Sequence, residues 1–289
     1  MHRIIPALAF LALSALPALA AEPISIVAAE NFYGEAAAAI GGDGVKVSSV
    51  IVQQGTDPHD YEPTPSVATS VADAGVVILN GADYDPWMGR LVDASANDTR
   101  KVIDVAALIG HKPGDNPHVW YDPKAMPALA DAIADTLGAL DPAGKAGYDA
   151  RRDQYLASLA PIQQKVDQLR AAFAGTPVTA TEPVFGYMAE ALGFKMQNDA
   201  FQTAIMNETE PSAAAIASME DDIKNGRVKV LFYNSQVEDP LTQHLSETAK
   251  AAGVPVVGVT ETLPEGQTFT QWMLGELDAT AKALGAPAS

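Results

Sequence analysis

Short β-branched or apolar runs alternate with helix-like stretches along most of this chain, and this order limits the folds open to it. Runs with the length and composition of strands occur at residues 24–27, 45–52, 76–79, 101–105, 177–181, 228–233 and 254–259. Helix-like stretches, several of them starting at or after Ser, Thr or Pro, occur at residues 66–74, 211–224, 241–252 and 268–284. Because strands that alternate with helices pair in parallel, the sequence predicts an α/β protein whose parallel sheets are flanked by helices.

The alternation is interrupted once, between residues 124 and 173, where no strand pattern occurs. Over residues 145–173 the apolar side chains recur at helical spacing, and basic side chains fall on other faces. One long helix between two sets of βα units predicts two lobes joined by a rigid helix. The predicted parts are an export signal at 1–20, an N-terminal α/β lobe at 21–144, the connecting helix at 145–174 and a C-terminal α/β lobe at 175–289. A single large α/β domain with one long helix is the alternative.

The first twenty residues have the pattern of a cleaved secretory signal. Arg3 precedes an apolar run at residues 4–16, and Ala18-Leu19-Ala20 forms a small-x-small cleavage site. No later stretch contains the roughly 20 apolar residues that a membrane span requires. We therefore expect a mature chain that begins at Ala21, is exported to the periplasm and does not insert into the membrane.

Composition narrows the classes of partner and of metal site. The formal net charge of -18 becomes -19 when Arg3 is removed with the signal, and such a chain repels nucleic acid and anionic lipid. The chain has no cysteine, so any metal must be held by His, Asp or Glu. We expect a monomer that binds no nucleic acid.

Two histidines lie in proline-containing loops amid acidic and aromatic residues, in Asp57-Pro58-His59-Asp60-Tyr61 and in Asn116-Pro117-His118-Val119-Trp120. Proline fixes its own φ angle, so each histidine is expected on a stiff turn, which suits a rigid coordination site. In open α/β sheets ligands bind beyond the carboxyl ends of the strands. His59 and His118 both follow predicted strands, and so do Glu182 and Glu261. These four residues, two from each lobe, are the candidate metal ligands.

These two motifs, with Thr181-Glu182-Pro183-Val184-Phe185-Gly186-Tyr187, resemble those of the zinc/manganese-type solute-binding proteins of bacterial ABC importers. The resemblance covers nearly the whole mature chain. It implies a receptor that captures one divalent transition metal ion, Zn²⁺ or Mn²⁺, and delivers it to an inner-membrane ABC permease. It also implies metal ligation by His59, His118 and Glu182, with Glu261 near the place where relatives carry an aspartate. One departure is Asn234, where relatives often have a glutamate.

Two imidazoles and two carboxylates suit zinc, manganese or iron, whereas calcium takes oxygen ligands only. One alternative function is a secreted metal-dependent hydrolase, although the chain carries no His-Glu-x-x-His or Gly-x-Ser-x-Gly motif. Another is a binding protein for a metal chelate or an organic solute. Glu182 could instead be a solvated carboxylate at a strand end, and Glu261 could cap the next helix. His111 and His244 are interpreted as bystanders, and Asp60, Glu62 and Asp122 as possible partners of the histidine rings.

Overall fold

The computed structural model describes residues 22–54, 56, 58–59, 61–95, 97–236 and 239–286. The predicted export signal at residues 1–20 and the predicted ring partner Asp60 lie outside the described residues. Within the described part of the chain, no helix combines the length and the apolar character that crossing a membrane would require.

The N-terminal half forms a parallel sheet with strand order β2-β1-β3-β4. Its strands are β1 (Ile24–Glu30), β2 (Val45–Ile51), β3 (Val76–Leu79) and β4 (Lys101–Asp104). Its helical segments are α1 (Asn31–Gly41), η1 (Gly42–Gly44), α2 (Pro65–Asp73), α3 (Pro86–Ala94), α4 (Val105–Leu108), η2 (Val119–Tyr121) and α5 (Ala125–Leu140).

The C-terminal half forms a second parallel sheet with the corresponding order β6-β5-β7-β8. Its strands are β5 (Pro177–Ala180), β6 (Lys195–Gln197), β7 (Leu231–Asn234) and β8 (Val256–Val259). Its helical segments are η3 (Pro183–Phe185), α7 (Gly186–Ala191), α8 (Asp199–Met206), α9 (Ala213–Lys224), α10 (Pro240–Ala251) and α11 (Phe269–Ala283). The predicted fold class, two parallel-sheet lobes joined by a long helix, is confirmed.

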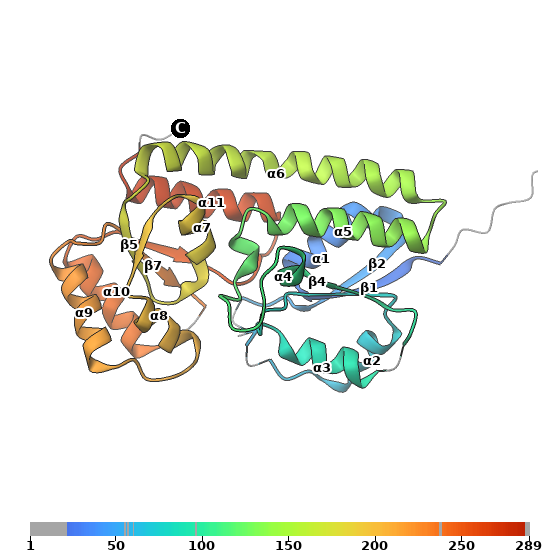
Figure 1. Ribbon diagram of the computed structural model, residues 1–289, viewed down its shortest axis with the longest axis horizontal. Helices are drawn as coiled ribbons and strands as arrows, with labels where there is room; N and C mark the ends of the chain where they lie inside the picture. Colours follow the sequence, from blue (N-terminus) through green and yellow to red (C-terminus); the bar gives the residue numbers. More distant parts are fainter. Residues whose placement is uncertain are drawn as a thin grey trace, which may run out of the picture.

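The connecting helix α6 (Lys145–Phe173) runs along both lobes (Figure 1). It packs on α1 and α5 in the first lobe and on α11 in the second. Its buried face repeats at helical spacing and comprises Tyr148, Tyr155, Leu159, Ile162, Val166 and Leu169. Pro161 lies inside the helix on its exposed side. The helix spans the residues that the apolar periodicity predicts, while the remaining lobe boundaries stay a prediction.

Several helices begin where local side-chain chemistry satisfies their first N–H groups. Thr64 accepts a hydrogen bond from Val67 N, and Pro65 fills the first helical position of α2. Thr268 and Gln271 form a reciprocal capping box at the start of α11. The predicted helix 268–284 therefore begins one residue later than expected, because Thr268 is its cap rather than its first residue.

The two lobes share one hydrophobic core beneath α6. Phe32 from the first lobe lies 6.5 Å from Phe269 and 5.6 Å from Trp272 of the second lobe, measured between ring centroids. Tyr121 lies 5.4 Å from Phe185 across the same boundary. The lobes are thus held together by packed aromatic rings as well as by the connecting helix.

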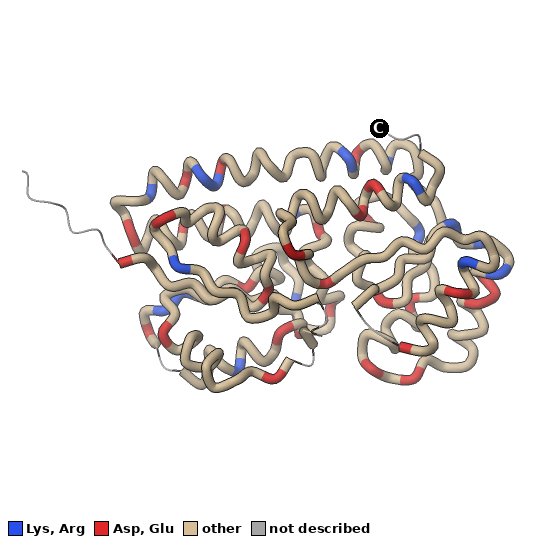
Figure 2. The backbone as a smooth tube through the Cα atoms, turned by 180° about the vertical axis from the view of Figure 1, so that it is seen from behind, with Lys and Arg blue, Asp and Glu red and all other residues tan. Residues whose placement is uncertain are grey.

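Charge is spread over the molecule. Figure 2 shows Asp and Glu positions, in red, along the chain in both lobes. The net negative charge therefore does not by itself indicate where a cation would bind.

Candidate metal centre

The structure brings three of the four predicted ligands together where the carboxyl ends of the two sheets face each other. His59 lies in the loop after β2, His118 in the loop after α4, and Glu261 follows β8. One donor atom from each of these side chains lies within 4.8 Å of the other two. The two imidazoles come from one lobe and the carboxylate from the other, so an ion bound here would contact both lobes.

The distances within this group are close to those that a shared ion would require. His118 Nε2 lies 3.4 Å from Glu261 Oε2, and His59 Nε2 lies 3.9 Å from the same oxygen. His118 is fully buried and Glu261 is 2% exposed, whereas the His59 side chain is 24% exposed. The candidate site is therefore a buried group of donors that reaches solvent on the His59 side.

Glu182, the fourth predicted ligand, joins the group through Asn234. The Asn234 amide Nδ2 donates to Glu182 Oε2 at 2.9 Å and to Glu261 Oε1 at 2.6 Å. Its two hydrogens thus lie between the two carboxylates, and all three residues are buried. The main-chain N–H of Asn234 donates to Thr181 Oγ1, which fixes the end of β7 against the residue before Glu182.

The orientation of His118 is set by Asn116. Asn116 Oδ1 lies 2.7 Å from His118 Nδ1 and also accepts the His118 main-chain N–H at 3.2 Å. Since an amide oxygen only accepts, the ring carries a hydrogen on Nδ1, and Nε2 is the ring nitrogen that faces Glu261. The Asn116 amide group donates across the lobe boundary to the carbonyl of Pro183, next to Glu182.

The first lobe anchors both histidine loops through the segment after β3. Trp87 Nε1 donates to the carbonyl of Pro58, and Asn80 Nδ2 donates to that of Pro117. Tyr84 donates its hydroxyl to Glu261 Oε2 at 2.9 Å, and its ring lies 4.7 Å from the ring of His59. The segment after β3 therefore positions both loops and contacts the carboxylate of the opposite lobe.

Glu261 is held as an anion. Burial alone would raise its pKa, but the hydrogen bond and charge of His118, the charge of His59 and the Tyr84 hydroxyl together lower that pKa to about 2. Gln236 Oε1 accepts the main-chain N–H groups of Glu261 and Thr262, which fixes the loop. A buried carboxylate with these partners is suited to bind a cation.

A second buried carboxyl, Glu276 on α11, lies beneath this loop. Its Oε1 accepts from Trp272 Nε1 at 2.8 Å and from Thr260 N at 3.2 Å. The Tyr121 hydroxyl lies 2.7 Å from Glu276 Oε2 and 2.8 Å from the Thr260 carbonyl. Burial raises the pKa of Glu276 to about 8. Glu276 thus links the residue before Glu261 to the segment that follows His118.

His111, Asp122 and His244 lie outside the group formed by His59, His118 and Glu261. His111 Nε2 lies 3.6 Å from Asp122 Oδ2, and the His111 ring lies 4.6 Å from that of Tyr187. Asp122 is therefore close to His111, whereas Asn116 is the partner of the His118 ring. The His244 side chain is 56% exposed on α10 and lies 3.3 Å from Glu220, which agrees with its interpretation as a bystander.

Sequence reasoning missed the roles of Asn116, Tyr84 and Glu276. Asn116 had a usable signal, because the side chain of an Asn in a turn commonly accepts a hydrogen bond from the main-chain N–H two residues later, here that of His118. Tyr84 and Glu276 had none, because their contacts depend on how the two lobes meet.

Comparison with known proteins assigns the chain to a family. A family model described as "Zinc-uptake complex component A periplasmic" matches residues 26–283. The manganese-binding lipoprotein MntA of Halalkalibacterium halodurans is 27% identical over 244 residues, which cover 82% of this chain and 78% of that protein. The manganese ABC transporter substrate-binding lipoprotein PsaA of Streptococcus mitis is 25% identical over 288 residues, which cover 92% and 91% respectively.

A solved structure has the same fold. The periplasmic zinc binding protein TroA from Treponema pallidum superposes with a TM-score of 0.76 at 21% identity, covering 92% of this chain and all of that one. The long family match covers both lobes and all four predicted ligands. This chain therefore belongs to the Zinc-uptake complex component A family, whose members are solute-binding proteins and not enzymes.

Proposed function

We propose that this protein captures one divalent transition metal ion, zinc or manganese, in the periplasm and delivers it to an inner-membrane ABC permease. The observation that carries the proposal is the group formed by His59, His118 and Glu261, whose donor atoms lie within 4.8 Å of one another. Family membership and the names of the relatives, which include a manganese ABC transporter substrate-binding lipoprotein, support the same function. The protein acts as a monomer that holds the ion between its lobes.

In this proposal the ligands are the Nε2 atoms of His59 and His118 and the carboxylates of Glu182 and Glu261. The Asn116 bond to His118 Nδ1 supports the tautomer that such ligation requires. Two neutral imidazoles and two carboxylates balance the charge of a divalent ion. In the structure the Asn234 amide occupies the electropositive position between the carboxylates, and the ion takes over this role as cargo.

The donor set accepts either metal. Nitrogen and oxygen ligands together suit both zinc and manganese, and the general order of affinities favours zinc at such a site. We therefore expect the protein to bind zinc more tightly than manganese in a direct titration. Supply in the periplasm then decides which ion it carries.

The test is a calorimetric titration of metal-stripped protein lacking residues 1–20, first with zinc and then with manganese at the same pH. We expect one equivalent of each metal to bind. His59→Ala and His118→Ala should each weaken binding by about two orders of magnitude or more, because each removes one of four ligands. Glu182→Gln and Glu261→Gln should do the same while leaving the shape of the site unchanged.

The matched control is His244→Ala, which removes an exposed histidine far from the proposed ligands. It should bind both metals as the wild type does. Absence of zinc and manganese binding in the wild type would refute the proposed function. Normal binding by Glu182→Gln alone would remove only Glu182 from the ligand set.

A further inference from the structure

Three consecutive residues after β3 have a left-handed backbone. The φ angles of Gly81, Ala82 and Asp83 are 78°, 49° and 64°, and no other run of positive φ angles occurs in the part of the chain that the structure describes. Glycine adopts such angles freely, but a residue with a Cβ atom is strained there. We call these three residues the left-handed turn. It persists only because its surroundings hold it.

Asp85 supplies hydrogen bonds that hold the left-handed turn. Its carboxylate accepts the main-chain N–H of Asn80 at 2.7 Å and that of Gly81 at 2.9 Å. Asp85 is 2% exposed, so water has little access to these bonds. Hydrogen bonds to a charged acceptor are stronger than bonds between neutral groups. Asp85 is therefore placed to offset the strain of the turn.

The left-handed turn is tied to the loop that carries His118. Asn80, directly before the turn, donates its side-chain amide to the carbonyl of Pro117 at 2.8 Å. Asp83, within the turn, accepts the main-chain N–H of Gly114 through Oδ2 at 3.0 Å. A change in the turn would therefore move both contacts with this loop.

The left-handed turn also sets the position of Tyr84, the residue that follows it. The main-chain N–H of Tyr84 donates to the Gly81 carbonyl at 3.0 Å, which closes the turn. The Tyr84 hydroxyl donates to Glu261 Oε2 at 2.9 Å, and its ring lies 4.7 Å from that of His59. Through Tyr84 the turn thus contacts proposed ligands from both lobes.

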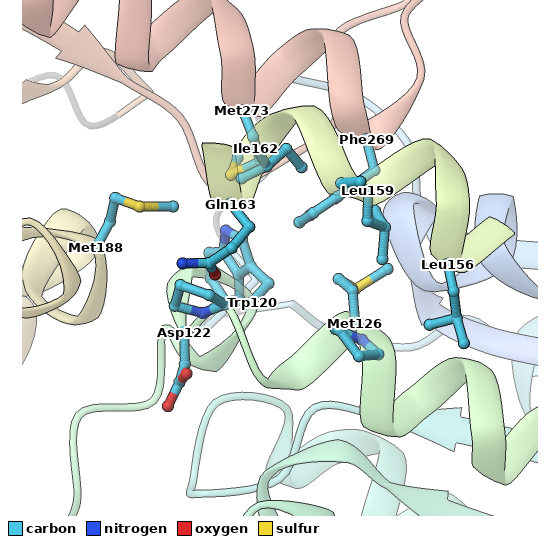
Figure 3. Close-up of a pocket in the computed structure, with 13 residues that line it drawn as sticks. Trp120, Asp122, Met126, Leu156, Leu159, Ile162, Gln163, Met188, Phe269 and Met273 are labelled. Carbon is cyan, nitrogen blue, oxygen red and sulfur yellow. The ribbon is translucent and has the colours of Figure 1, made fainter. Parts of the chain in front are cut away.

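The packing behind Tyr84 leaves room for a second arrangement. The Tyr84 ring lies 4.9 Å from the ring of Trp120, which lines a pocket of about 240 Å³ beneath α6. Figure 3 shows Trp120 among the residues that line this pocket, together with Leu159 and Ile162 of α6. Side chains beside a void can shift without displacing close-packed neighbours, so Trp120 can yield if Tyr84 moves.

We propose that Asp85 is a positioning residue of the metal centre, which holds the left-handed turn in the form that places Tyr84 and the His118 loop for metal binding. This inference rests on the proposed metal-binding function. When the bonds of Asp85 are lost, or when strain is added, the turn relaxes and the ligands no longer converge. The apparent affinity for metal then falls with the fraction of molecules whose turn is held.

Asp83 allows the strain to be varied at an exposed position. Asp83→Gly and Asp83→Val both remove the hydrogen bond to Gly114 N. Only valine is strongly disfavoured at the φ angle of 64°, because it is β-branched. In a calorimetric titration with zinc, we expect Asp83→Val to bind about fivefold more weakly than Asp83→Gly.

Glu208→Gly and Glu208→Val form the control pair. Glu208 has a φ angle of 51° and lies between α8 and α9 in the second lobe, outside the segment after β3. At both positions valine should give a lower unfolding free energy than glycine, because the strain acts on the folded state. Only at position 83 should the zinc affinity change as well.

A rescue experiment tests Asp85 itself. Asp85→Asn keeps the shape and one acceptor but presents an amide group to the second N–H, so zinc binding should weaken about tenfold. Ala82→Gly removes strain that Asp85 opposes, so the double variant Ala82→Gly/Asp85→Asn should recover about fivefold of that loss. Burial raises the pKa of Asp85 to about 7, so the titrations are made above that pH, where the carboxylate is ionised.

The inference is wrong if the two Asp83 variants bind zinc equally, if the Glu208 pair differs in affinity as much as the Asp83 pair, or if Ala82→Gly fails to restore binding to Asp85→Asn. The Asp83 pair decides the question even if Asp85→Asn does not fold. Absence of zinc binding by the wild type would instead refute the proposed function on which the inference rests.

Discussion

At the scale of single residues, Asn234 compensates the two buried carboxylates of the candidate site in the absence of a metal ion. Its amide donates to the carboxylates of Glu182 and Glu261, which would otherwise face each other in a buried place. Two such carboxylates without a donor or a cation are unfavourable, because neither is solvated. Asn234 therefore stabilises the pair of buried carboxylates in the metal-free protein.

This role predicts the effect of Asn234→Leu. Without metal the variant should lose about 1.5–3 kcal/mol of unfolding free energy per hydrogen bond to a charged group. Saturating zinc should raise the melting temperature of the variant more than that of the wild type, because the cation restores the missing partner. Calorimetric melting with and without zinc measures both effects.

Asn225→Leu is the control for this variant. Asn225 also donates to a carboxylate, Asp221 Oδ1 at 2.6 Å, but on the exposed surface. We expect a change within about 0.5 kcal/mol and no dependence on zinc. Equal losses in the two variants would show that Asn234 has no special role between the carboxylates.

The sequence predicts which residues lie at the candidate site better than it predicts the hydrogen bonds that position them. His59 and His118 could be found because proline bracing and a place beyond a strand are local properties. Asn234 stood out only as a departure from relatives, since the sequence does not show that its amide reaches carboxylates 27 and 52 residues away. The assignment of Glu182 as a ligand stays a prediction.

At the scale of elements, Glu276 connects α11 to the candidate metal centre. This helix contributes no proposed ligand, yet its Glu276 carboxyl holds Thr260, the residue before Glu261. The same carboxyl contacts Tyr121, three residues after His118. Through Glu276, α11 therefore contacts both the loop that carries Glu261 and the segment that follows His118.

Glu276 also predicts a pH dependence of stability. Its pKa is about 8 in the folded protein, against an ordinary value of 4.5, so between these values the folded chain keeps a proton that the unfolded chain has lost. Its stabilising contribution is complete below the ordinary value and is lost as the pH rises through about 8. Between the two pKa values the unfolding free energy should fall by about 1.4 kcal/mol for each unit of rising pH.

The measurement is urea unfolding of the wild type and of Glu276→Gln across this pH range. Glutamine keeps an acceptor for Trp272 and Thr260 but does not titrate, so the variant should lose less stability as the pH rises. Glu190→Gln makes the same substitution at an exposed carboxyl on α7 and should follow the wild type. Parallel curves for all three proteins would contradict the assignment.

Elements with a strong local pattern could be predicted, and short ones could not. The strand at residues 76–79 is fully buried and was found with its observed bounds. β6 (Lys195–Gln197) was missed because it has three residues, two of them exposed, and is a strand only by pairing with β5. The helices α1 and α3 were missed as well. In α1 the many alanines and glycines weaken the periodicity, whereas α3 had a usable signal in its proline start.

At the scale of the whole molecule, the shared core limits how far the lobes can move. Phe32, Phe269 and Trp272 pack across the boundary, and α6 packs on α5 and α11. Separation of the lobes would expose these rings to water, which is unfavourable. The predicted rigid connection of the lobes therefore involves the core as well as the helix.

We expect metal binding to leave the radius of gyration unchanged within experimental error, because the packed core permits only small shifts. Small-angle scattering of metal-free and zinc-bound protein at matched concentration measures this quantity. Zinc-bound His118→Ala, which should bind poorly, is the control for effects of the added salt. A large decrease on zinc binding in the wild type would show closure by a flexible hinge.

The position of Pro161 gives the connecting helix an uneven bending stiffness. A proline has no N–H, so the carbonyl four residues earlier loses its helical hydrogen bond, and the ring crowds that turn. The helix therefore consists of two stiff segments with one compliant turn at mid-length, beside the pocket. Elastic strain from any small movement between the lobes would therefore concentrate at this turn.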